Sequence, residues 1–114
     1  MLPKVDFREL PPTLRQFIRS YPKVWSAHEK LEMATARAGP LSEKEIQLIK
    51  LAVTGSHMLE TAFKTHVQKA SRGGATAAEI EHAIIQLLPI VGMGRTMMAM
   101  KWYRESLGGK RIKR

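Results

Sequence analysis

Apolar side chains recur at three- and four-residue steps along most of the chain, which is the spacing of an amphipathic α-helix. The clearest case lies between residues 59 and 70, where the stripe comprises Leu59, Ala62, Phe63, His66, Val67 and Ala70. Shorter stripes occupy residues 14–18, 24–38, 46–53, 80–88 and 97–103. No segment alternates apolar and polar residues over a useful strand length. The pattern therefore predicts an all-α protein, a compact bundle of about six helices.

The expected helix ends carry their own signals. Ser42 with Glu45, and Thr76 with Glu79, have the spacing of a capping box. In that motif the side chain of each residue accepts a hydrogen bond from the backbone N–H of the other. Glycine favours the residue after a helix, and proline cannot continue one. On these grounds helices should end or bend at Gly39-Pro40, Gly55-Ser56, Gly73-Gly74, Pro89 and Gly108-Gly109.

The composition fits one folded domain, because 44% of the 114 residues are apolar. We divide the chain into N-terminal helices (1–38), a core (39–109) and a basic tail (110–114). The chain has no cysteine, which excludes disulfides, thiolate metal ligands and thiol redox chemistry within it. We find neither a signal peptide nor an apolar run long enough to span a bilayer, so we expect a cytoplasmic protein.

The formal net charge is +9, and four of the basic side chains lie in the tail at residues 110–114. Such a tail can bind nucleic acid or an anionic membrane. It can equally be a frayed, solvated terminus, since five residues are too few for a folded recognition element. We favour the second interpretation, and therefore expect neither nucleic acid nor a membrane as a partner.

One segment, Gly39–Ile49, is followed along the chain by His66, Gly74, Thr76, Glu79-Ile80 and Gly92. This order and spacing resemble the carboxymuconolactone decarboxylase family, which includes the alkylhydroperoxidase D-like proteins. The resemblance implies a helical fold built on a central helix hairpin. It also implies a homo-oligomer, commonly a trimer or hexamer, with sites near subunit contacts.

The resemblance also bears on chemistry. Peroxidase members use a cysteine pair and a relay glutamate, and the corresponding positions here are Leu59, Ala62 and Gln47. A thiol peroxidase needs a thiolate nucleophile, so that activity is not expected. The decarboxylase branch lacks the cysteines and has two glutamates before its histidine. Glu60 matches the first of these, and Ala62 departs from the second. Ile90 and Gly94 depart from the aromatic residue and proline that the family tends to have around the Gly92 turn.

His66 is the leading candidate for a catalytic acid or base, because imidazole titrates near neutral pH and a place on an apolar stripe would perturb its pKa. The alternative is a core histidine with a satisfied hydrogen bond. His57 and Glu60 are three residues apart and would share a helix face, so they could relay a proton or supply two metal ligands. Alternatively they form a surface pair, or His57 lies in the bend before the helix.

Arg95 follows the Gly92–Gly94 turn and could hold the carboxylate of a substrate, unless it is an ordinary exposed arginine. With it, we expect a substrate pocket lined by Leu59, Ala62 and Phe63. The other acidic and histidine candidates, at positions 79, 81 and 82, belong to a different helix, so no metal site is expected. We expect no cofactor either, because a stripe of Met97, Met98, Met100 and Trp102 is more typical of core and oligomer interface than of a haem or flavin site.

Two functions fit these observations. The first is acid–base chemistry, decarboxylase-like or related, on a small organic acid, with His66 as the acid or base and help from Glu60 or His57. The second is a non-catalytic protein that keeps the fold to bind a small ligand or to act as an oligomeric scaffold. Measured turnover that depends on His66 would separate the two.

Overall fold

The computed structural model describes residues 7–107 and is helical throughout, with no strand in that range. Its elements, in chain order, are η1 (Phe7–Glu9), α1 (Pro12–Ser20), α2 (Pro22–Ala36), α3 (Glu43–Ser56), α4 (Glu60–Arg72), α5 (Ala77–Ile85), α6 (Leu88–Val91) and α7 (Met93–Leu107). The all-α prediction is confirmed, with α6 as a single added turn. The Gly108-Gly109 helix end and the basic tail lie outside the described residues.

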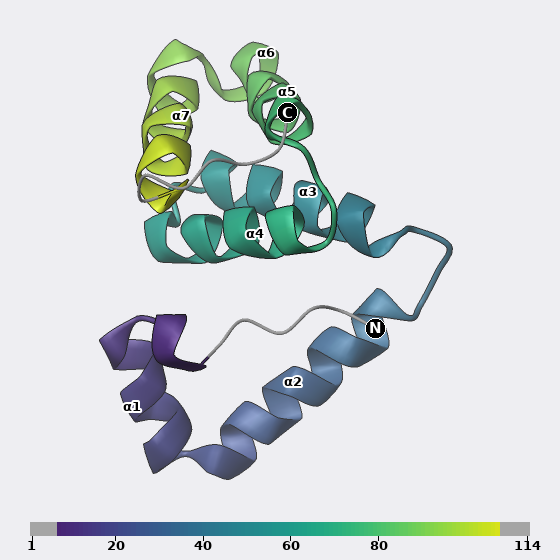
Figure 1. Ribbon diagram of the computed structural model, residues 1–114, viewed down its shortest axis with the longest axis vertical. Helices are drawn as coiled ribbons and strands as arrows, with labels where there is room; N and C mark the ends of the chain where they lie inside the picture. Colours follow the sequence, from purple (N-terminus) through teal and green to yellow (C-terminus); the bar gives the residue numbers. More distant parts are fainter. Residues whose placement is uncertain (1–6, 108–114) are drawn as a thin grey trace.

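The helices form two groups (Figure 1). In the upper group α3 and α4 make the most extensive pairing, and α5 and α7 pack against them. In the lower group α1 and α2 form a hairpin, and neither contains a buried residue. None of the helices in residues 7–107 has the length and apolar character that a bilayer crossing requires.

Both predicted capping boxes are present. Ser42 Oγ accepts a hydrogen bond from the Glu45 backbone N–H at 3.1 Å, and Glu45 Oε1 accepts one from the Ser42 N–H at 2.8 Å. Thr76 and Glu79 make the same two bonds at 3.1 and 2.9 Å. Glu79 also accepts a bond from Lys44 Nζ at 2.9 Å, which ties the start of α5 to the start of α3. The caps therefore set where the central helices begin.

The prediction that Pro89 ends the fifth helix is wrong. Helix α5 ends earlier, at Ile85, and Pro89 lies in the first turn of α6. Proline is tolerated there because the first backbone N–H groups of a helix have no intrahelical acceptor. The chain turns after α6 at Gly92, whose φ of 90° lies in the region that favours glycine. Gly94, by contrast, lies inside α7.

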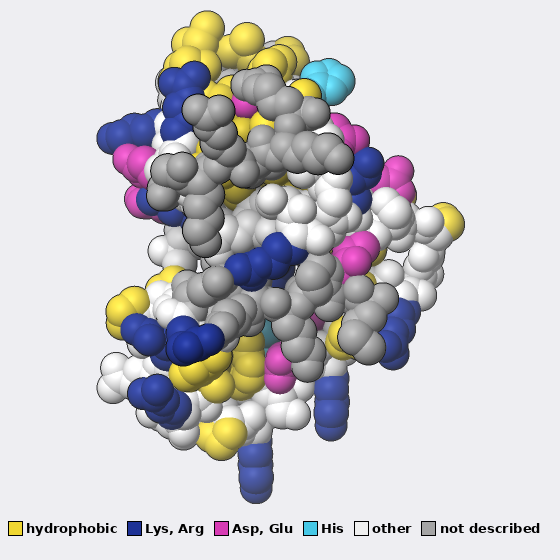
Figure 2. Space-filling model, in the orientation of Figure 1, with side chains coloured by type: hydrophobic (Ala, Val, Ile, Leu, Met, Phe, Trp, Pro, Cys, Tyr) yellow, Lys and Arg dark blue, Asp and Glu magenta, His cyan; other side chains and the backbone are white. Residues whose placement is uncertain are grey.

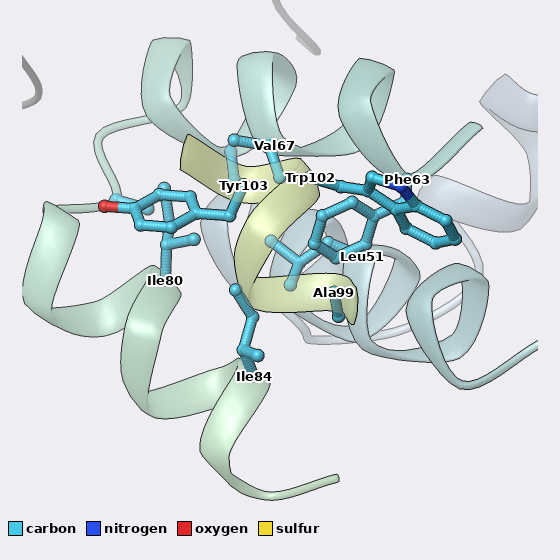
Figure 3. Packing of buried hydrophobic residues seen from close by; sticks show 10 residues of the cluster. Leu51, Phe63, Val67, Ile80, Ile84, Ala99, Trp102 and Tyr103 are labelled. Atoms are coloured by element: carbon cyan, nitrogen blue, oxygen red, sulfur yellow. The ribbon is translucent and has the colours of Figure 1, made fainter. Parts of the chain in front are cut away.

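The core lies between α3, α4, α5 and α7 (Figure 3). Its main side chains are Leu51, Phe63, Val67, Ile80, Ile84, Ala99, Trp102 and Tyr103. Phe63 packs against Trp102 with 6.1 Å between ring centroids. Gly55 lets α3 approach α4 closely, because a Cβ at that position would come within 3.1 Å of the Phe63 ring. The central hairpin is thus fixed by tight packing on one side.

Candidate functional site

A side-chain hydrogen bond joins the two helices of the central hairpin at mid-length. His66 on α4 places its ring nitrogen Nδ1 2.9 Å from Oε1 of Gln47 on α3. Gln47 is 1% exposed, and His66 is half-buried beside the buried side chain of Val67. The imidazole therefore lies at the edge of the apolar stripe of α4, with one nitrogen held inside the protein.

The bond also decides which nitrogen of His66 carries the hydrogen. The amide oxygen of Gln47 can only accept, so the His66 Nδ1–H must donate to it. In a neutral imidazole the second nitrogen, Nε2, then keeps its lone pair. The arrangement leaves His66 with one free basic atom and a fixed ring orientation, which is what a general base requires.

The charge state of His66 is set by its surroundings. Its pKa is lowered from 6.5 to about 4, mainly because burial disfavours the charged imidazole. The positive charges of Lys69 and Lys50 act in the same direction, and the carboxylate of Glu32 opposes them. His66 is therefore neutral at physiological pH. Because two lysines act on it against a single carboxylate, the local charge favours an anionic ligand.

The structure separates His57 from Glu60. His57 is the C-cap of α3, and Glu60 is the first residue of α4, with a turn between them. The helix face that the pair was expected to share does not exist, because the helix starts only at Glu60. Glu60 instead accepts a bond from Lys64 at 2.9 Å, and Lys64 also binds Glu105 at 3.0 Å. Within residues 7–107 no three histidine or acidic side chains are grouped to hold a metal ion.

The other expected pocket residues are scattered. Phe63 is fully buried in the core, and Ala62 is half-buried on α4. Leu59 is the N-cap of α4 and 52% exposed. Arg95 donates from Nη1 to the backbone oxygen of Ser56 at 3.0 Å, so it satisfies a carbonyl at the C-terminal end of α3. Ala62 and Phe63 lie one helical turn before His66 on α4, whereas Leu59 lies at the start of that helix and Arg95 near the start of α7. The surface hollows of about 220 and 190 Å³ are lined by none of these four residues, so their place in a substrate pocket stays a prediction.

Sequence reasoning missed the residues that do surround His66. Gln47 was identified only as the position that corresponds to the relay glutamate of peroxidase members, yet in this chain it bonds His66. On α3, Lys50 follows Gln47 by three residues, and on the facing α4, Lys69 follows His66 by three residues. Residues three apart share a helix face, so this spacing could have predicted that the two lysines lie near His66. Glu32 on α2 had no such signal, because only the tertiary fold brings its Oε2 to 3.9 Å from Lys69 Nζ on α4.

The comparisons with known proteins agree with this fold. The model of the carboxymuconolactone decarboxylase family matches residues 20–105. The match begins well before Gly39 and so takes in α2 as well as the central hairpin. No curated protein and no solved structure gave a significant match to the chain. Since the family model covers most of the sequence, the chain belongs to the carboxymuconolactone decarboxylase family.

Proposed function

We propose that this protein binds a small organic acid beside His66 and transfers a proton through that imidazole. The observation that carries the proposal is the 2.9 Å bond between His66 Nδ1 and Gln47 Oε1 on a neutral ring. Lys50 and Lys69 supply the positive charge that would attract the acid. No cysteine is present, so thiol peroxidase chemistry plays no part.

The chemistry of a decarboxylation suits this arrangement. Loss of CO₂ from a carboxylate leaves its electron pair on carbon, and that carbon must take up a proton. A bound acid would offset the charges of Lys50 and Lys69 and so raise the pKa of His66. The imidazole would then take a proton from solvent on Nε2 and deliver it to the carbon, returning to the neutral state.

A non-catalytic binding role is the alternative that one observation favours. Gln47 cannot ionise, so it orients His66 without raising its basicity as a carboxylate would. With a pKa of about 4, the His66 imidazole is a weak base at neutral pH when no acid is bound. A protein that only holds an acid needs nothing more. The two roles share the binding site and differ in turnover.

We expect benzoate or succinamate to raise the pKa of His66, as followed by NMR titration of the imidazole. Exposed His57 and His82 in the same spectra serve as internal controls and should not respond. An unresponsive His66 would contradict the binding site. Where an acid that releases CO₂ is found, His66→Gln should lower the rate by about 10²-fold or more. Binding without any such acid would leave the non-catalytic role.

We further propose that the protein associates with copies of itself through an apolar surface around α6. This α6 patch comprises Val53, Ile85, Leu88, Ile90 and Met93, all exposed in the single chain. Ile90 is 80% exposed and, with Val53, borders a surface hollow of about 220 Å³. Figure 2 shows apolar side chains gathered at this end of the molecule. A patch of this kind is typical of a subunit contact.

Replacing Ile90 with glutamate should therefore dissociate the oligomer, because a charge placed in an apolar contact loses its hydration. Light scattering coupled to size-exclusion chromatography would measure the mass. Lys101→Glu, an exposed change on α7 away from the patch, is the matched control and should leave the mass unchanged. A monomeric wild-type protein at tens of micromolar would contradict the proposal.

A further inference from the structure

The positive charge around His66 is partly cancelled by a side chain from the other helix group. Glu32 on α2 places Oε2 3.9 Å from Lys69 Nζ. Its second oxygen, Oε1, lies 3.2 Å from His28 Nε2 on the same helix. The 3.9 Å separation is too long for a hydrogen bond, so Lys69 keeps its donors available while it is held electrostatically. Lys69 is only 20% exposed, which limits screening by water.

A hollow of about 190 Å³ lies between the end of α2 and α3. It is lined by Thr35, Ala36, Leu41, Ile46, Ile49 and Lys50. Lys50 is its one charged lining residue, and no carboxylate in residues 7–107 pairs with that ammonium group. Thr35 and Ala36 lie one helical turn beyond Glu32. An acid in this hollow would thus have Lys50 for its carboxylate and would lie about one helical turn from Glu32.

We propose that Glu32 makes this a site for acids with one negative charge and excludes those with two. The inference rests on the proposed organic-acid site and names its substrate class. The Lys50 ammonium group can bind one carboxylate by donating to it, while Lys69 stays paired with Glu32. A second carboxylate would have to compete with Glu32 for Lys69, and would meet its negative charge at short range.

Succinamate and succinate form a matched pair of probes, because they have the same carbon chain and differ by one negative charge. Calorimetric titration of the wild-type protein should give tighter binding of succinamate, by about tenfold. In Glu32→Gln, which keeps the size of the side chain, that preference should vanish or reverse. Glu29→Gln on the same helix is the control and should keep the wild-type ratio, since Glu29 is exposed and forms no ion pair within residues 7–107.

The outcomes separate this inference from the function on which it rests. If both acids bind and the ratio is the same in wild type and Glu32→Gln, Glu32 does not set the charge preference and the inference fails alone. If wild type binds succinate as tightly as succinamate, it also fails while the acid site stands. If neither acid binds any of the three proteins, the organic-acid site itself is wrong.

Discussion

Replacing Phe63 with alanine is expected to lower the free energy of unfolding by about 3–5 kcal/mol. The ring is fully buried between α3 and α7 and contacts Trp102 across 6.1 Å between centroids. The space that it leaves cannot close easily, because Gly55 on the facing helix has no side chain to fill it. Urea denaturation followed by circular dichroism, at one fixed protein concentration, would measure the loss.

Leu59→Ala is the matched control for this experiment, since Leu59 is 52% exposed on the same helix. It should change the free energy of unfolding by less than about 0.5 kcal/mol. The sequence placed both residues in a substrate pocket. If Phe63→Ala left stability intact and abolished acid binding, Phe63 would belong to a substrate pocket and its assignment to the core would be wrong.

The second large effect concerns pH. The pKa of His66 is about 4 in the folded protein and close to 6.5 in the unfolded chain, so between these values the unfolded chain binds more protons. The stabilisation is present above pH 6.5 and is lost as the pH falls through 4. Wild type should lose up to about 3 kcal/mol of stability by this route. Burial is the main cause of this lowered pKa; the positive charges of Lys69 and Lys50 add to it, and the carboxylate of Glu32 opposes them.

His66→Gln removes the titrating group and keeps a donor for Gln47. The difference in unfolding free energy between wild type and this variant should therefore shrink steadily from pH 7 to pH 4. Taking the difference cancels the loss of stability at low pH that comes from capping carboxylates, which both proteins share. One of these is Glu45, whose pKa the Ser42 backbone N–H holds below its usual value. His82→Gln, at an exposed position, should run parallel to wild type. Parallel curves for His66→Gln would contradict the buried neutral imidazole.

Much of the fold was predictable because its signals are local. The capping boxes at Ser42 and Thr76 depend on residues three positions apart, and both formed as predicted. The apolar stripe of α4 predicted that Phe63 and Val67 would be buried. Pro89 shows the limit of such signals. Proline can follow the end of one helix or occupy the first turn of the next, and only the path of the chain decides between these two positions.

The site was less predictable because it depends on contacts between helices. His66 was identified from its spacing, but spacing alone placed it in the middle of the stripe rather than at its edge. The partner of its Nδ1 lies on another helix, and Glu32 comes from a third. Arg95 was expected to hold an acid, and its bond to the Ser56 carbonyl at the end of α3 is a contact that no pattern within α7 reveals.

The bond between His66 and Gln47 has an evolutionary consequence. Glutamine and glutamate have the same length and both present an oxygen to the imidazole, so exchange between them keeps the ring in place and changes only the charge. A descendant of this protein could gain an ionisable partner for His66 by one substitution on α3, without repacking the hairpin. A cysteine pair on α4 would require substitutions at both Leu59 and Ala62. An ionisable partner for His66 is therefore one substitution away from this chain, whereas a thiol pair is two substitutions away.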